Sequence, residues 1–247
     1  MFETGLVSIS FRGYPVEQIV KEAAKAGLTY IEWGSDVHAP CKDTKALEHI
    51  VALQNKYGIT CCSYGTYFRL GITALEELPD YIRAAKILGT TTLRLWAGDK
   101  SPDKYSPEEK AALFDQCRQA ARIAEDSGVM LCMECHRNTF VETKEGAMVL
   151  MRAVDSANFG MYWQPNPYDT PEENLLYAQY LEKYVSHIHA FCRTGDDAHP
   201  LAEGIGQWQT YLKVFSRDHK VLLESMPDNR IESLQQEAAT LRKIISI

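Results

Sequence analysis

Four polar side chains end short apolar segments in the second half of the chain: Glu134, Gln164, His189 and Glu224. Two carboxylates, one amide oxygen and one imidazole form a ligand set that suits a divalent cation such as Mn, Mg, Co or Zn. A pair of carboxylates can also move protons to and from a substrate. Each residue alone is more often a solvated rim residue or a hydrogen-bonded core residue. The predicted chemistry therefore requires a fold that brings all four together.

Residues 129–136 show how such a side chain is presented. Their apolar run lacks Gly and Pro and is typical of a buried parallel strand. Because side chains alternate along a strand, Glu134 and His136 share one face, and Leu131 and Met133 share the other. A carboxylate at the exit of a buried strand is costly unless something pairs with it. We therefore expect Glu134 to have a charged or hydrogen-bonding partner.

The same strand pattern recurs along the chain and alternates with segments of helical periodicity. The expected strands are 5–11, 28–33, 59–64, 91–96, 129–136, 159–164, 186–191 and 220–225. The expected helices are 44–57, 73–88, 107–126, 143–154, 171–184, 207–217 and 231–245, after a first one that begins at Pro15 and stops at Gly27. Eight such units predict a (β/α)8 TIM barrel, an α/β fold. No linker-like segment divides the chain, so we expect one barrel domain over residues 1–247.

A closed barrel gives the strand ends a common location. All strand C-termini meet at one mouth, where the active sites of such barrels lie. Glu134, Gln164, His189 and Glu224 would then approach each other from the last four strands. An open, doubly wound sheet would instead require a glycine-rich phosphate turn after an early strand, and residues 10–14 do not form one.

The composition narrows the class of partner. The 247 residues include 26 Lys and Arg against 33 Asp and Glu, a net charge of -7, which argues against nucleic acid. We see no apolar run of membrane-spanning length and no secretory signal. Seven cysteines, an odd number, favour reduced thiols and a cytoplasmic location, with the Cys132–Cys135 pair read as buried strand residues. We expect a small-molecule substrate and leave a homo-oligomer open.

Several strand-end motifs occur together in a recognisable order. They are Met133-Glu134-Cys135-His136, Trp163-Gln164-Pro165-Asn166, His187-Ile188-His189 and Leu223-Glu224-Ser225-Met226-Pro227, with Ile31-Glu32-Trp33-Gly34, Asp36 and His38 earlier in the chain. As a set, they resemble the sugar phosphate isomerase/epimerase family, the xylose isomerase-like barrels. The resemblance implies that Glu134, His189 and Glu224 bind a divalent metal and that both glutamates handle protons. Gln164 stands where many relatives carry Asp, which removes one negative charge.

The expected activity is a metal-dependent isomerisation or epimerisation of a sugar or sugar-like polyol, a reaction of carbohydrate metabolism. A cation that holds an α-hydroxy ketone by two oxygens would acidify the adjacent C–H bond and stabilise the enediolate that forms. Glu134 and Glu224 would remove and return the proton as an acid/base pair. Two alternatives stay open: a lyase resembling an inosose dehydratase that uses the same site, and a non-catalytic sugar-binding barrel.

Further side chains at the predicted mouth are candidates for substrate binding. Arg94 and Trp96 share a face of strand 91–96, where Arg94 could hold an anion or pair with Glu32, and Trp96 could pack against a sugar ring. His136 and Arg193 could contact substrate hydroxyls or an anion. Glu32 is also a candidate substrate-binding residue. We expect His187 to be an oriented core histidine and Trp33 to pack against a helix.

Overall fold

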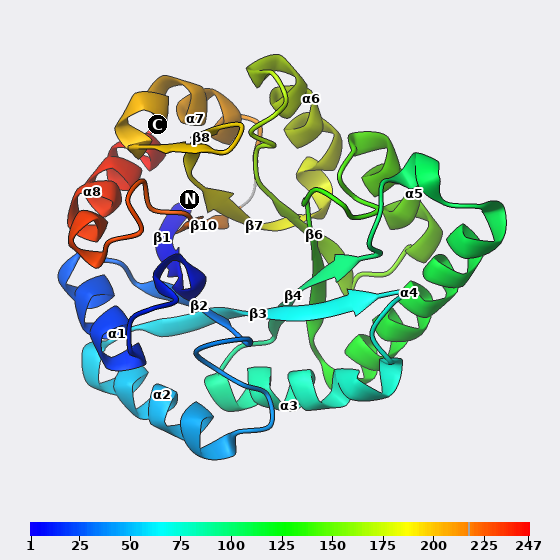
Figure 1. The fold of residues 1–247 in the computed structure, drawn as a ribbon, viewed down its shortest axis with the longest axis horizontal. Coiled ribbons are helices and arrows are strands. Elements are labelled where there is room, and N and C mark those ends of the chain that lie inside the picture. The colour runs from blue at the N-terminus through cyan, green and yellow to red at the C-terminus, as the bar shows by residue number, and fades with distance from the viewer. Residues whose placement is uncertain (217) are drawn as a thin grey trace.

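The computed structural model describes residues 1–216 and 218–247. In this part of the chain, eight parallel strands close into a barrel in the order β1-β10-β7-β6-β5-β4-β3-β2, and eight α-helices surround it (Figure 1). The barrel strands are β1 (Phe2–Val7), β2 (Tyr30–Gly34), β3 (Thr60–Leu70), β4 (Thr92–Ala97), β5 (Met130–Glu134), β6 (Phe159–Trp163), β7 (Val185–Ala190) and β10 (His219–Leu223). The helices are α1 (Val16–Lys25), α2 (Thr44–Tyr57), α3 (Leu78–Leu88), α4 (Pro107–Ser127), α5 (Lys144–Val154), α6 (Pro171–Leu181), α7 (Ile205–Leu212) and α8 (Leu234–Ile245). The predicted (β/α)8 barrel is confirmed.

Local sequence signals set the helix limits. Helix α4 begins after Ser106, whose hydroxyl accepts from the Glu109 backbone N–H while the Glu109 carboxylate accepts from the Ser106 N–H, a complete capping box. It ends at Gly128, which has φ of +66° and so adopts the left-handed conformation that glycine tolerates. Gly58 closes α2 in the same way. These signals lie in the sequence itself, and for this reason the ends of α2 and α4 were predictable.

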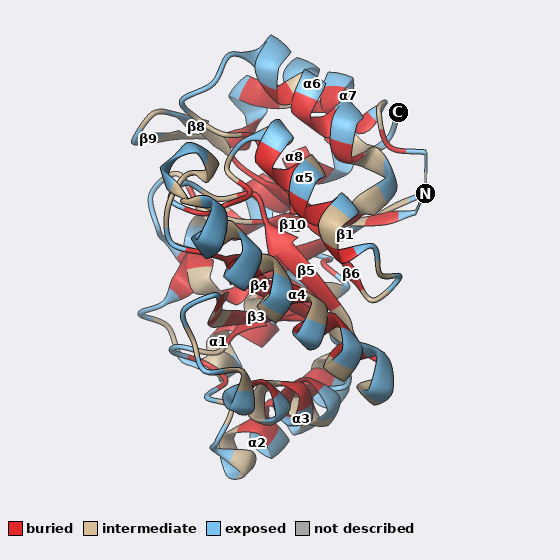
Figure 2. Ribbon diagram, turned by 90° about the vertical axis from the view of Figure 1, so that its right-hand side faces the viewer, coloured by how far each residue is buried: buried red, intermediate tan, exposed pale blue. Residues whose placement is uncertain are grey.

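The strands are buried on both sides. Figure 2 shows buried strands at the centre and helices that are buried on their inner faces and exposed outside. Leu131 and Met133 of β5 are completely buried in the apolar layer between strands and helices. Trp33 packs toward α2 as predicted, and its Nε1 donates to Gln54 Oε1 at 2.8 Å. Alternation along each strand leaves the other face for the barrel interior.

Several segments differ from the sequence-based prediction. The first strand spans Phe2–Val7 rather than residues 5–11, and Ser8–Phe11 form a 3-10 helix. Strand β3 runs to Leu70, through residues 65–70 that were expected to form a loop, because Phe68 and Leu70 are buried and the strand continues past a register shift between Gly65 and Arg69. After β7 the chain forms an antiparallel hairpin, β8 (Cys192–Thr194) with β9 (Asp197–His199). Helix α7 then ends at Leu212, short of the predicted 207–217, and Arg217 lies outside the described residues. The assignment of residues 1–247 to one domain stays a prediction.

A search of the described residues finds no helix long and apolar enough to span a bilayer.

Candidate active site and metal centre

The four strand-end residues singled out in the sequence meet at one end of the barrel. Glu134 is the last residue of β5, Gln164 follows β6, His189 lies near the end of β7, and Glu224 follows β10. These four strands are consecutive neighbours in the barrel. His189 Nδ1 lies 2.9 Å from Gln164 Oε1, 3.4 Å from Glu224 Oε2 and 3.5 Å from Glu134 Oε1. The structure thus gathers three oxygens around one imidazole nitrogen.

This arrangement fits a divalent cation. Glu134, His189 and Glu224 each offer a ligand atom, and these atoms lie within 4.8 Å of one another. The amide oxygen of Gln164 adds a neutral donor beside them. Carboxylate, imidazole and amide donors are the ligand types that Mg, Mn and Zn accept. A metal centre formed by the triad is therefore chemically reasonable, and the structure does not select one metal.

The charge balance of the site also favours a divalent cation. The completely buried Glu32 and the mouth residues Glu134 and Glu224 supply three negative charges, while Arg94 supplies one positive charge. Burial would lower the pKa of His189, but the charges of Glu224 and Glu32 outweigh it and raise that pKa well above its usual value. His189 can thus carry a proton in this environment. A divalent cation beside a neutral His189 would balance the remaining charge.

Glu134 is held by two donors from β4. Arg94 Nη1 and Trp96 Nε1 donate to the same oxygen, Oε2, at 2.5 and 2.6 Å. Burial would raise the pKa of Glu134, but the Arg94 charge and then the His189 contact lower it well below its usual range. Arg94 also donates from Nε to Glu32 Oε1 at 2.9 Å, and its charge, with that of His189, lowers the pKa of Glu32 to about 2 against the effect of burial. The predicted partner of Glu134 is therefore Arg94.

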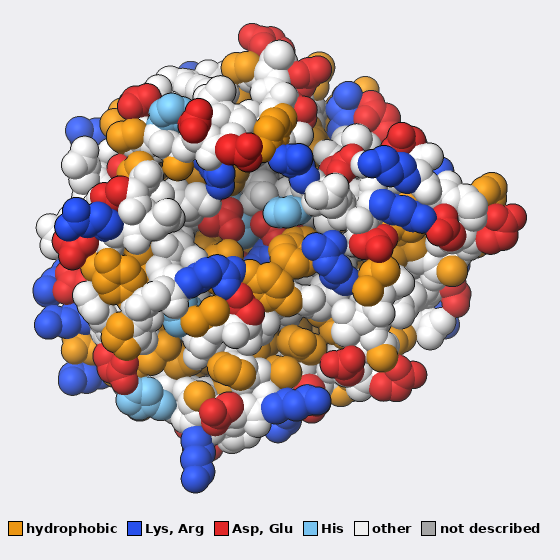
Figure 3. Space-filling model, in the orientation of Figure 1, with side chains coloured by type: hydrophobic (Ala, Val, Ile, Leu, Met, Phe, Trp, Pro, Cys, Tyr) orange, Lys and Arg blue, Asp and Glu red, His pale blue; other side chains and the backbone are white. Residues whose placement is uncertain are grey.

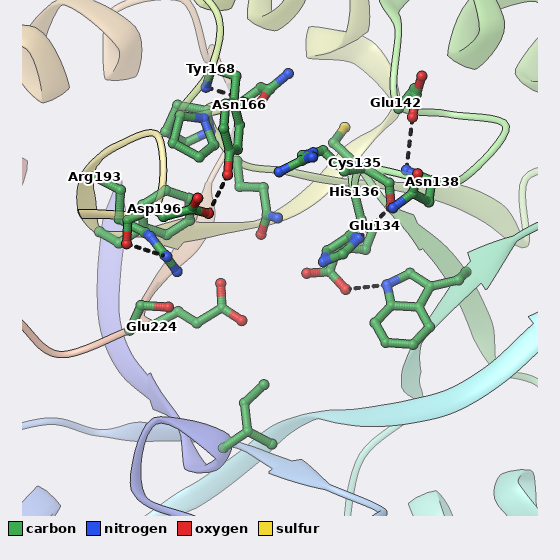
Figure 4. A pocket seen from close by; sticks show the side chains of 18 of the residues that line it. Glu134, Cys135, His136, Asn138, Glu142, Asn166, Tyr168, Arg193, Asp196 and Glu224 are labelled. Carbon is green, nitrogen blue, oxygen red and sulfur yellow. Dashed lines mark hydrogen bonds between the residues drawn. The ribbon is translucent and has the colours of Figure 1, made fainter. Parts of the chain in front are cut away.

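Glu134 and Glu224 of the triad, together with Gln164, line a cavity of about 470 Å³ at the barrel mouth. Figure 3 shows a hollow near the centre of this face, with acidic side chains and a histidine inside and Lys or Arg side chains around it. In Figure 4, Glu134 and Glu224 lie on opposite sides of the space with their carboxylates turned toward each other. A small polar molecule bound between them would contact both carboxylates.

The other predicted substrate contacts divide into two groups. Arg94, Trp96, His136 and Arg193 all line the cavity. The His136 ring leans on Trp96 with ring centroids 5.3 Å apart, and Arg193 Nη2 donates to the Asp196 carbonyl oxygen at 3.0 Å. Glu32, in contrast, is completely buried below the cavity and is not among its lining residues. It can act on a substrate only through Arg94 or His189.

Sequence reasoning missed some mouth residues. Arg12 and Tyr67 line the cavity, and Arg12 donates to both Asp36 and Tyr67. The signal for Arg12 was its position just after the first strand, which in a barrel places it at the mouth. Tyr67 was assigned to a loop, so its place on β3 was not foreseen. His187 is buried and stacks on Tyr162 with centroids 5.1 Å apart, in line with the expected core histidine.

Comparisons with known proteins agree with this architecture. A curated relative, the 3-dehydroshikimate dehydratase of Bacillus anthracis, is 23% identical over 268 residues, covering 96% of this chain and 95% of the relative. The solved structure of the probable 3-DHS dehydratase of Bacillus anthracis matches with a TM-score of 0.82 at 19% identity, over 98% of this chain and 99% of that one.

Other solved structures share the fold. D-psicose 3-epimerase from Clostridium cellulolyticum H10 matches with a TM-score of 0.70 at 14% identity, over 97% of each chain. The IOLI protein, solved with a bound zinc atom, matches with a TM-score of 0.76 at 17% identity, over 99% of this chain and 98% of that one. The family model described as xylose isomerase-like TIM barrel matches residues 20–244. As the strand-end motifs predicted, the chain belongs to the xylose isomerase-like TIM barrel family.

Proposed function

We propose that this protein is a divalent-metal-dependent isomerase or epimerase of a sugar or sugar-like polyol. The observation that carries the proposal is that Glu134 and Glu224 face each other across one cavity, with His189 within 3.5 Å of both carboxylates. Two carboxylates facing each other across a small space suit proton transfer at a carbon held between them. The solved D-psicose 3-epimerase with this fold supports the same reaction class.

The metal would be held by Glu134, His189 and Glu224, with Gln164 as an additional oxygen donor. A divalent cation bound there supplies a Lewis acid that polarises the substrate carbonyl and makes the neighbouring C–H more acidic. A solved structure of the same fold that contains zinc supports a metal-binding role for such a barrel.

The chain's own residues would then move the proton. A carboxylate on one side of the cavity removes the proton next to the carbonyl, a step worth about 10²–10⁴-fold in rate. Return of the proton to the opposite face of the same carbon gives an epimer, and return to the neighbouring carbon gives an isomer. Trp96 offers an aromatic wall, and His136 and Arg193 offer donors for substrate oxygens.

A second candidate is a dehydratase. It is favoured by the relative named 3-dehydroshikimate dehydratase, which aligns over nearly the whole of both chains. Such a lyase begins with the same proton removal, and the electron pair then expels hydroxide from the adjacent carbon. The same carboxylates and the same cavity serve both reactions, so the product distinguishes them.

The proposal can be tested by proton exchange. The protein is stripped of metal, reloaded with Mn²⁺ and incubated in D2O with a panel of ketoses and ketopolyols, and products are followed by NMR. We expect deuterium at the carbon next to the carbonyl, and loss of this signal in Glu134→Gln and Glu224→Gln.

Glu142→Gln is the matched control for these variants. Glu142 also lines the cavity, but its carboxylate accepts a bond from the Asn138 backbone N–H at 2.8 Å, which a Gln oxygen can keep. This variant should exchange at the wild-type rate. Exchange that survives in both Glu134→Gln and Glu224→Gln would remove the glutamates from the chemistry. Sugar binding without exchange would identify a non-catalytic barrel.

A further inference from the structure

We propose that Arg94 is a positioning residue that makes the two glutamates unequal: it fixes the orientation of Glu134, with Oε1 free to face the triad and the cavity, and leaves Glu224 as the carboxylate that can turn toward the substrate. The inference rests on the proposed function, because it assigns roles within that site. It also identifies Gly65, a residue with no reactive side chain, as the position that makes this arrangement fit. Neither role follows from the strand-end motifs.

The first observation is the choice of oxygen. Arg94 Nη1 and Trp96 Nε1 both donate to Oε2 of Glu134. The other oxygen, Oε1, faces His189 Nδ1 at 3.5 Å. Because both donors bind the same oxygen, the carboxylate is oriented with Oε1 toward the triad before a metal or substrate binds. Donors that orient a metal ligand from behind typically change metal affinity or activity by about 10–100-fold when they are removed.

The second observation is that Arg94 is itself immobilised. Its Nε donates to Glu32 Oε1 at 2.9 Å, and Ser63 Oγ donates to Glu32 Oε2 at 2.7 Å. Glu32, Ser63 and Arg94 are all at most 1% exposed. They come from β2, β3 and β4, so three strands hold the guanidinium that orients the ligand on β5. A buried ionic network of this kind keeps its geometry because any displaced charge would lose its partner in a nonpolar interior.

The third observation concerns the space that the network occupies. Gly65 on β3 lies opposite Arg94 of β4 in the sheet register. A Cβ atom at Gly65 would lie 2.5 Å from Glu32 Oε1 and 2.7 Å from Arg94 Nη2. Both distances are far below van der Waals contact, so any larger residue would push the pair apart. Gly65 is therefore required for the Glu32–Arg94 contact, and its replacement would disturb Arg94 without altering a charge.

Glu224 has a different environment. It follows β10 and its side chain is 12% exposed, compared with 3% for Glu134. His189 Nδ1 lies 3.4 Å from its Oε2, and no guanidinium of the described residues lies within ion-pair distance of its carboxylate. Its carboxylate faces the cavity from the side opposite Glu134. A carboxylate that is less constrained and closer to solvent can turn toward a substrate, whereas one held by two short bonds keeps a fixed orientation.

The experiment uses Gly65→Ala, Arg94→Lys and Arg94→Gln in the full-length protein. Gly206→Ala is the matched control, because a Cβ at Gly206 meets nothing within 4 Å. Three readouts are measured: Mn²⁺ affinity of the metal-free protein by electron paramagnetic resonance, kcat and KM for substrate deuterium exchange, and the indole N–H resonance of Trp96 in a ¹H–¹⁵N spectrum, assigned with Trp96→Phe. Circular dichroism checks that each variant is folded.

We expect Gly65→Ala and Arg94→Gln to weaken Mn²⁺ binding and lower kcat by about 10–100-fold, with a smaller change in KM. The Trp96 indole signal should move upfield, because its bond to Glu134 loosens. Arg94→Lys should recover part of the affinity, and Gly206→Ala should match the wild type in every readout.

Folded Gly65→Ala or Arg94→Gln protein with wild-type Mn²⁺ affinity and an unchanged Trp96 resonance would overturn the proposal. The resonance reports the Glu134 contact even if the wild type turns over no ketose, so failure of the proposed function and failure of the Arg94 role give different results. If Arg94→Gln does not fold, Gly65→Ala still decides the question, because it changes no charge.

Discussion

Two histidines on β7 show how the barrel interior changes along its axis. His187 and His189 are two residues apart and lie on the same face of the strand. The charges of Glu224 and Glu32 raise the pKa of His189 well above its usual value against the effect of burial. Burial, and then the charge of Lys220, lower the pKa of His187 to about 3. One layer of depth thus separates a protonated imidazole from a neutral one.

The difference lies in what neighbouring strands contribute to each layer. At the mouth, β2, β5 and β10 bring carboxylates toward His189. One layer lower, β6 brings the Tyr162 ring, which stacks on His187, and β10 brings Lys220 in register with it. The mouth layer is therefore suited to hold a cation, whether a proton or a metal ion, and the lower layer to fill space. The surroundings thus make His189 a residue that can bind a proton or a metal ion and His187 a neutral packing residue.

The strongest test replaces each of the two histidines in turn and compares the effects on metal binding. We expect His189→Gln to lose Mn²⁺ binding by at least about 100-fold, because it removes the central donor of the proposed metal site. His187→Gln should bind Mn²⁺ with wild-type affinity, because His187 is not part of the triad and its ring stacks on Tyr162. Calorimetric titration of the metal-free proteins measures both. Equal losses in the two variants would show that the layers are not distinct.

Metal binding should depend on pH through His189. Its raised pKa means that both Nδ1 and Nε2 carry a proton near neutral pH in the metal-free protein, and a metal can bind only after one of these protons leaves. Affinity should therefore rise with pH, by up to about tenfold per unit, until the pH passes the His189 pKa. Mn²⁺ titrations in buffers of different ionisation enthalpy would count the released proton. A flat affinity between pH 6 and 8 would argue that His189 is neutral before binding.

His187 should make the stability of the fold depend on pH in the acidic range. Its folded-state pKa of about 3 lies below the ordinary 6.5, so the unfolded chain takes up a proton that the folded protein does not. Above pH 6.5 the protonation of His187 does not affect the free energy of unfolding. As the pH falls from 6.5 toward 3, that free energy decreases by at most about 1.4 kcal/mol per pH unit. Urea unfolding of wild type and His187→Gln between pH 7.5 and 5 isolates this effect. The difference between the two proteins should shrink as the pH falls; a constant difference would contradict the lowered pKa.

The smallest expected effect concerns Lys220. Its charge lowers the pKa of His187, and its Nζ lies 3.6 Å from Glu3 Oε2 in a partly exposed pair. Lys220→Gln should raise the His187 pKa modestly, because burial remains the larger cause. NMR titration of the His187 ring would follow it. Mn²⁺ affinity should stay unchanged, and a marked change would mean that charge in the lower layer reaches the triad.

Much of the fold and the core of the site were accessible from the sequence. Apolar runs, helix caps and the repeated strand-helix alternation predicted the barrel, and the barrel placed Glu134, Gln164, His189 and Glu224 at one mouth. The length of β3 was not predictable, because Gly65 and Arg69 read as loop residues although the strand continues through a register shift. The hairpin after β7 was missed for a similar reason, since three-residue strands carry too few residues to show a pattern.

The sequence by itself determined which side chains end the strands, because hydrophobic periodicity and caps are local properties of the chain. Only the tertiary structure decided which of them touch: that Arg94 contacts both Glu32 and Glu134, that Gly65 makes room for this contact, and that His187 and His189 have opposite charge preferences. The reason is physical. A pKa or an ion pair depends on distances between residues that are far apart in sequence, and the register and closure of the barrel set those distances.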